Sequence, residues 1–192
     1  MTNERAEKTT DLIIDFLKDI GIPVTFEKLP DPGFLPGIFV QEGGLIINRD
    51  ELLYPGDILH EAGHLAVMPP QTRMQANGNV GDDGGEEMAA LAWSYAAACA
   101  IGLSPDIVFH EFGYKGNGPW LSKHFQNGGT IGVPLLAVFE MTSPHIPRLQ
   151  QPDTSIDEAA AFPSMLQWLR TIPDLSEETS LPTHRAQQAS FI

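Results

Sequence analysis

Residues 57–67 read DILHEAGHLAV and contain two histidines, His60 and His64, four positions apart. On an α-helix of about 3.6 residues per turn, positions i and i+4 share one face, so both imidazoles can bind one ion. Glu61 lies beside that face and can act on a water at the same ion without being a ligand. This spacing is the HExxH pattern, and it predicts a metal-binding helix with zinc as the cofactor.

The residues around the motif predict a buried helix. They are mostly apolar, and Pro69 and Pro70 end the pattern. Gly63, inside the motif, costs about 1 kcal/mol of helix stability relative to alanine. Such a glycine is tolerated where another element packs very close to the helix. The alternative to a metal site is a buried helix with two hydrogen-bonded histidines, or a chance match to the pattern.

Composition narrows the class of protein. The 192 residues suffice for one domain, which we place at residues 1–172 with a weakly ordered tail at 173–192. The net charge of −14 argues against nucleic acid or an anionic membrane as partner. The single cysteine, Cys99, cannot form an internal disulfide, and its alanine-rich setting predicts a small buried residue. The first eight residues contain no apolar signal core, and the chain has no apolar stretch of membrane-spanning length, so we expect a cytoplasmic protein.

The pattern of the chain predicts an order of elements around the motif. Before the motif we expect a frayed start over 1–8, a helix over 10–20, a strand over 24–29 and a hairpin over 37–48. After it we expect a loop over 69–85, a helix over 86–100, mostly loop over 106–133, an element of undefined type over 134–141, and short helices over 157–161 and 164–170.

A catalytic zinc keeps three protein ligands and one open position, so the two histidines need a partner. Glu86 and Glu87 begin the helix that follows the loop. If Asp83 is the N-cap, Glu86 lies at N3 and completes a pair that resembles a capping box. That explains Glu86 without a metal and leaves Glu87 as the predicted third ligand. Glu86 remains the alternative, and helix capping alone can account for both acids.

At this point the chain resembles the gluzincin branch of the zincin metallopeptidases, in which a helix after HExxH carries a glutamate ligand. Residues 87–92, EMAALA, are most similar to the Glu-Ala-Asn-x-Phe-Ala segment of the minimal ImmA/IrrE-type metallopeptidases. The resemblance covers about residues 35–100. It departs at Ala89, where those proteins have asparagine, and at Leu91, where gluzincins have aspartate. The groups that orient the two histidines are therefore not identified.

The resemblance implies an α+β fold, a minimal zincin-like domain. It would contain an N-terminal helix, a small β-sheet with a hairpin, the HExxH helix and a downstream glutamate helix. In this arrangement Glu61 is the general base for hydrolysis of a peptide bond. The oxyanion needs a further donor, for which His110, Tyr114 and Arg73 are candidates because they lie in loop or glycine-rich segments. For each of them an ordinary loop or structural contact is the simpler interpretation.

The sequence thus predicts a zinc-dependent metallopeptidase whose partner is a peptide or protein substrate. Two alternatives stay open: a catalytically inert zinc-holding module that regulates or binds, and a metal hydrolase for a non-peptide amide. His124, His145 and His184 are expected at the surface, and Trp93 and Tyr95 in the core.

Overall fold

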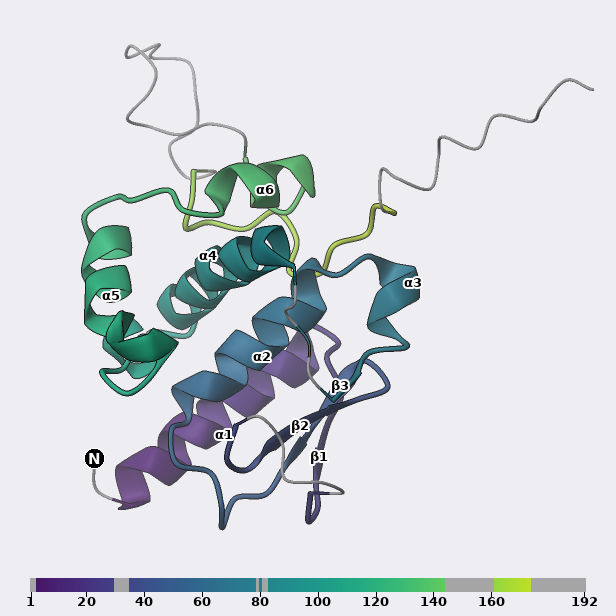
Figure 1. Cartoon of the computed structure of the whole chain (residues 1–192), viewed down its shortest axis with the longest axis vertical. Helices are drawn as coiled ribbons and strands as arrows, with labels where there is room; N and C mark the ends of the chain where they lie inside the picture. Colours follow the sequence, from purple (N-terminus) through teal and green to yellow (C-terminus); the bar gives the residue numbers. More distant parts are fainter. Residues whose placement is uncertain (1–2, 30–34, 79, 81–82, 144–160, 174–192) are drawn as a thin grey trace, which may run out of the picture.

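Helices and a small sheet build the computed structural model, which describes residues 3–29, 35–78, 80, 83–143 and 161–173. The fold is mixed α+β, with six α-helices and a four-stranded sheet among these residues (Figure 1). The elements, in chain order, are α1 (Asn3–Asp19), β1 (Val24–Phe26), β2 (Ile38–Gln41), β3 (Gly44–Ile47), α2 (Gly56–Val67), α3 (Pro70–Arg73), β4 (Asn77–Gly78), α4 (Gly84–Ala100), the 3-10 turns η1 (Pro105–Ile107) and η2 (Tyr114–Gly116), α5 (Gly118–Gln126) and α6 (Val133–Val138).

The sheet confirms the predicted hairpin. Its strand order is β1-β3-β2-β4, with β1 parallel to β3 and with β2 antiparallel to both β3 and β4. Glu42 and Gly43 join β2 to β3 at φ 49° and 75°. Two positive φ values in a two-residue turn match the right-handed twist of the strands. The strand predicted over 24–29 exists as β1 but ends at Phe26.

The centre of the molecule is the contact between α2 and α4. Figure 1 shows α4 lying between α2 on one side and α5 and α6 on the other. A Cβ atom on Gly63 would lie 2.9 Å from both the Ala90 carbonyl oxygen and the Ser94 Oγ atom of α4. Ser94 Oγ also donates to the carbonyls of Ala90 (2.7 Å) and Leu59 (3.2 Å), which ties the two helices together. Gly63 of α2 has no side chain and the alanines of α4 have small ones, and this allows the two helix axes to approach so closely.

The N-terminal helix is longer than predicted. Residues 3–8, expected to be frayed, form the first turns of α1, and Thr10 is not its cap. The Thr9 and Thr10 hydroxyls instead donate to the carbonyls of Arg5 and Ala6, each at 2.9 Å, as serine and threonine do inside helices. Gly21, at φ 89°, follows the helix end as predicted.

Several segments predicted as loops contain regular structure. Residues 69–85 include α3 and β4, residues 106–133 include α5, and the undefined element at 134–141 is the helix α6. The glycines around α5 made this segment resemble a loop in the sequence. In the structure they lie at the ends of the helix and at its contacts. A Cβ on Gly118 would collide with the backbone of Phe109 and His110, so this glycine permits close packing rather than loop flexibility.

The segment 161–173 is irregular, so the helix predicted over 164–170 is wrong. Several of its backbone groups bond to other elements. Leu166 N donates to Met141 O, Arg170 N donates to Ala66 O, and Trp168 O accepts from the buried Trp93 Nε1, all at 2.9 Å. The predictions for residues 157–160, for the tail from 174 onward, and for His145 and His184 lie outside the described residues.

Burial confirms two predicted core residues and contradicts one. Trp93 and Tyr95 are buried on α4, as expected, whereas Cys99 is exposed. Cys99 and Ala100, the last two residues of α4, are both exposed, so the alanine-rich pattern does not imply burial at its end. Within the described ranges, no helix combines the length and apolar character needed to cross a membrane.

We expect Gly63→Ala to destabilise the protein although it raises helix propensity. Propensity alone predicts a gain of about 1 kcal/mol, but the new methyl group would press on Ala90 and Ser94, and overpacking costs about 1–3 kcal/mol. Urea unfolding with EDTA present measures the free energy without a metal contribution. Gly84→Ala is the matched control, because a Cβ there meets nothing within 4 Å. A Gly63→Ala variant as stable as the wild type would contradict the close packing.

Candidate metal centre

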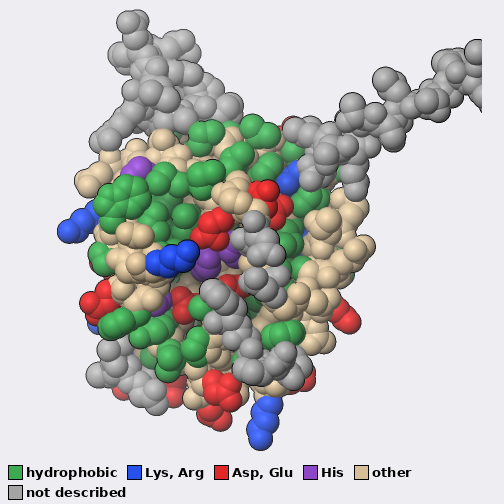
Figure 2. Space-filling model, viewed as in Figure 1, with side chains coloured by type: hydrophobic (Ala, Val, Ile, Leu, Met, Phe, Trp, Pro, Cys, Tyr) green, Lys and Arg blue, Asp and Glu red, His purple; other side chains and the backbone are tan. Residues whose placement is uncertain are grey.

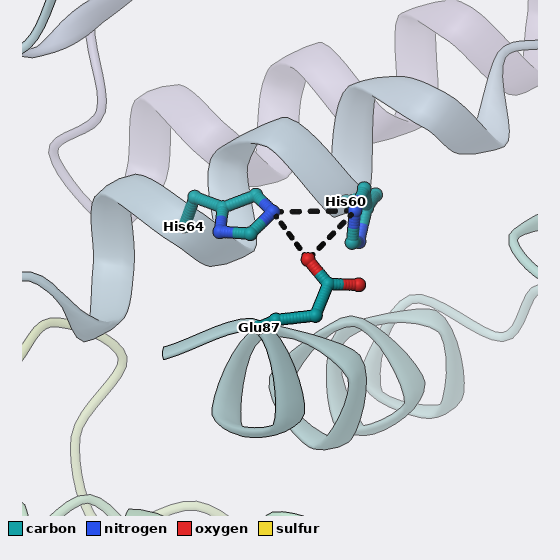
Figure 3. A group of neighbouring side chains, drawn as sticks. All are labelled: His60, His64 and Glu87. Atoms are coloured by element: carbon teal, nitrogen blue, oxygen red, sulfur yellow. Dashed lines mark hydrogen bonds and ion pairs between the residues drawn. The ribbon is translucent and has the colours of Figure 1, made fainter. Parts of the chain in front are cut away.

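Figure 3 shows two histidines of α2 and a glutamate of α4 pointing at one another. The Nε2 atoms of His60 and His64 are 3.2 Å apart. Glu87 Oε2 lies 3.2 Å from His64 Nε2 and 3.8 Å from His60 Nε2. This His-His-Glu group is therefore an arrangement that can hold a metal ion.

The geometry fits a tetrahedral ion. Ligand atoms about 2.0–2.1 Å from zinc at tetrahedral angles are roughly 3.3–3.4 Å from one another. The three distances in the His-His-Glu group, 3.2, 3.2 and 3.8 Å, lie around that value. Two nitrogens and one carboxylate oxygen are also a donor set that zinc accepts in catalytic sites.

Helix capping sets which glutamate reaches the histidines. Asp83 is the N-cap of α4, and its side chain accepts from the backbone N–H groups of Gly85 (2.7 Å) and Glu86 (2.9 Å). Glu86 thus occupies N3 as predicted, and Glu87, one position later, turns toward α2. The structure brings Glu87, and not Glu86, into the His-His-Glu group.

His60 is in the protonation state that a metal needs. Burial, together with the neighbouring His64, lowers the pKa of His60 to about 4, so His60 is neutral at pH 7. Burial would raise the pKa of Glu87, but the hydrogen bond with His64 and the charges of both histidines lower it overall. Both Nδ1 atoms are buried and have no hydrogen-bond partner among the described residues.

Glu61 lies on α2 between the two histidines without belonging to the His-His-Glu group. Burial raises the pKa of its carboxyl to about 7, and the negative charges of Asp57 and Glu87 add to the rise while His64 opposes it. A carboxyl poised near neutral pH beside a candidate metal position is a suitable acid–base group.

His110 is held close to the same end of α2 by Asp57. Its Nε2 atom lies 2.9 Å from Asp57 Oδ1, and Tyr54 stacks on the imidazole with the ring centroids 4.1 Å apart. Burial raises the pKa of Asp57, and the bond to His110 partly offsets this. Asp57 is one helical turn before Glu61. Asp57 had no role in the site predicted from the sequence, although its i, i+4 relation to Glu61 could have marked it as part of the site.

Tyr114 contacts His60 directly. Its ring meets that of His60 edge to face, with the centroids 5.1 Å apart. Its hydroxyl is buried and has no hydrogen-bond partner among the described residues. Burial, and then the charges of Asp57, Glu87 and Glu61, raise the pKa of Tyr114 well above its ordinary value, so the hydroxyl stays a donor.

Arg73, the remaining candidate donor, does not reach the site. Its guanidinium donates to the carbonyls of Leu65 (2.7 Å), Ala66 (3.2 Å) and Met68 (2.9 Å), where α2 ends. A further bond to Arg170 O at 2.7 Å ties in the segment 161–173. Of the two interpretations of Arg73, the structure shows the structural contact, because its donors satisfy the free carbonyls of a helix C-terminus.

A cavity of about 590 Å³ opens beside Glu87. Leu91, one turn further along α4, also lines it, together with residues from the stretch 114–121. In Figure 2 histidine and acidic side chains meet at the centre of this face, with a basic side chain beside them and hydrophobic side chains around. Of the His-His-Glu group, Glu87 lines this cavity, whereas neither histidine does.

Comparisons of the chain with protein families, with curated proteins and with solved structures found no match. The description of the site therefore rests on its own geometry.

We expect Glu87→Gln to weaken zinc binding far more than Glu86→Gln. Only Glu87 lies within reach of both histidines. Loss of a direct ligand should exceed the roughly 10–100-fold loss in affinity that follows removal of an outer partner. Competition with a chromophoric chelator measures both affinities on the folded proteins. If Glu86→Gln loses the metal and Glu87→Gln keeps it, the assignment of the third ligand is wrong.

Proposed function

We propose that this protein is a zinc-dependent metallopeptidase that hydrolyses peptide bonds at the His-His-Glu group. One observation carries the proposal: Glu61, half-buried on α2, lies between the two histidines in the chain without belonging to the group. A purely structural site has no use for such a carboxyl group, and it would need a fourth protein ligand. The resemblance to gluzincins of the ImmA/IrrE type supports the same function.

The residues of the chain divide the chemistry among them. A zinc ion bound by His60, His64 and Glu87 would supply Lewis acidity, which acidifies a water and polarises a carbonyl. Glu61 takes the proton from the attacking water and delivers it to the leaving nitrogen as the C–N bond breaks. Tyr114 donates a hydrogen bond to the carbonyl oxygen as negative charge develops there.

His110 is the second candidate donor to that oxygen. The bond to Asp57 and the stacking of Tyr54 fix the orientation of its ring. A donor fixed before the reaction needs no reorganisation when charge develops, which is what makes such groups effective. Asp57 and Tyr54 act through His110, so they are positioning residues.

Two other functions would use the same group. An inert module would hold zinc and bind a partner without hydrolysis, and a hydrolase for another amide would use the same acid–base carboxyl. The open cavity beside Glu87 favours a site that admits a ligand of peptide size.

We expect Glu61→Gln to keep its zinc and to lose hydrolysis. The amide has the size and polarity of the acid but cannot accept a proton. The rate should therefore fall by about the 10²–10⁴-fold typical of losing a positioned acid–base group. Zinc content, circular dichroism and cleavage of a broad peptide library are compared between variant and wild type. Equal cleavage by both proteins, or no cleavage by fully loaded wild type, would contradict the proposal.

We expect Tyr114→Phe to lower kcat by about 10²-fold or more, the usual effect of removing one oxyanion donor. KM and zinc affinity should change little, because only the hydroxyl is lost and the ring contact with His60 remains. Steady-state kinetics on a cleaved library peptide separates the two parameters. Tyr54→Phe is the control, since it keeps the ring that stacks on His110. An unchanged kcat in Tyr114→Phe would remove Tyr114 from the mechanism.

A further inference from the structure

The cavity beside Glu87 combines an apolar wall with polar groups at its rim. Leu91, Trp120 and Leu121 provide apolar surface, and the Lys115 ammonium and the Asn117 amide provide hydrogen-bond donors. Apart from the two α4 residues, the lining comes from a stretch of eight residues, 114–121, which forms η2 and the start of α5. The hydrogen-bond donors and the apolar side chains of the cavity lie close together. They therefore suit a ligand in which one residue carries both hydrogen-bond acceptors and an apolar side chain.

The backbone holds Lys115 in an unusual conformation. Tyr114 and Lys115 have φ values of 54° and 55°, a left-handed region that non-glycine residues rarely adopt. The turn is closed by bonds from Gly116 N to Gly113 O (2.9 Å) and from Asn117 N to Tyr114 O (3.1 Å). Left-handed residues of this kind gather at ligand sites, where the surrounding structure maintains them.

Lys115 also lacks a counter-ion within the described part of the chain. No carboxylate there forms an ion pair with its ammonium, although the whole chain has a net charge of −14. A cation left unpaired at the rim of a cavity, in a protein so rich in acids, is complementary to an anionic group of a ligand.

Trp120 is exposed yet fixed in place. It stacks on His124 with the ring centroids 5.0 Å apart. His124 is half-buried rather than at the surface, packs against Gly129, and accepts from Ile131 N at 3.4 Å. A rigid indole face at a cavity wall is a favourable surface for a large apolar side chain.

We propose that this cavity binds the C-terminal residue of a peptide substrate. The apolar side chain packs on Leu91 and Trp120, and the terminal α-carboxylate accepts hydrogen bonds from Lys115 and Asn117. This inference rests on the proposed function: Glu87 lines the same cavity, so a residue bound there presents a peptide bond near the chain end to the metal centre. The protein then acts as a carboxypeptidase that prefers large apolar ends and rejects lysine and arginine, whose charge Lys115 repels.

Binding is tested on the full-length, zinc-loaded Glu61→Gln protein, which should not turn over its ligand. Calorimetry compares N-acetyl-Ala-Ala-Phe as the free acid with the same peptide as its amide. We expect the free acid to bind about 5-fold more tightly, the upper range for an exposed ion pair. Lys115→Gln should abolish that difference, whereas Lys123→Gln, an exposed lysine of α5 outside the cavity, should preserve it.

Trp120→Ala tests the apolar half of the proposal. It should remove the preference for a C-terminal phenylalanine over alanine, and it should weaken binding of the phenylalanine peptide by about 10-fold. A free acid that binds no better than the amide, or a preference that survives Lys115→Gln, would overturn the assignment of the carboxylate site. An amidated peptide with an internal glutamate that matches the free acid would also overturn it, because the carboxylate then need not be terminal.

Hydrolysis by the wild type separates failure of the cavity proposal from failure of the proposed function. If peptides are cleaved without regard to the terminal carboxylate or to Lys115, the cavity proposal fails and the metallopeptidase stands. If the free acid binds through Lys115 but the loaded wild type cleaves no peptide, the cavity proposal stands and the hydrolytic function fails.

Discussion

The close approach of α2 and α4 determines the rest of the structure. Gly63 leaves no room for a Cβ against Ala90 and Ser94, and this contact places the first turn of α4 over the middle of α2. Glu87 can reach the Nε2 atoms of His60 and His64 only because the two helices are this close. The metal centre, if it forms, is thus a consequence of helix packing rather than of a flexible loop, and packed helices position a site more exactly than loops do.

The charges around this contact favour a cation. Asp57, Glu61 and Glu87 lie near one another in a largely buried region, and the charges of Asp57 and Glu87 raise the pKa of Glu61. All three raise the pKa of the Tyr114 hydroxyl. Crowded carboxylates in a low-dielectric setting repel one another, and a divalent ion at the His-His-Glu group would offset that repulsion. The same ion would turn Glu61 from a destabilising charge into a useful acid–base group.

Sequence patterns predicted the parts that depend on local spacing. The HExxH spacing, the Asp83 cap and the turn at Glu42-Gly43 each depend on neighbours a few residues away, and the structure contains all three features. Patterns failed where tertiary contacts decide. The glycines around α5 made that segment resemble a loop, and Arg73 remained a candidate oxyanion donor although it binds the carbonyls at the end of α2. Asp57 was missed because its partner His110 is 53 positions away in the chain. Trp120 was missed because α5, which pairs it with His124 at i, i+4, was predicted as loop.

X-ray absorption at the zinc edge of the loaded protein tests the central claim most directly. The account predicts a four-coordinate spectrum with two imidazole nitrogens and two oxygens at about 2.0–2.1 Å, one oxygen from Glu87 and one from solvent. Features of two imidazoles should appear in the multiple scattering, and replacing His60 should remove one of them. A sulfur shell near 2.3 Å, or a spectrum without imidazole, would contradict a metal centre built from His60, His64 and Glu87.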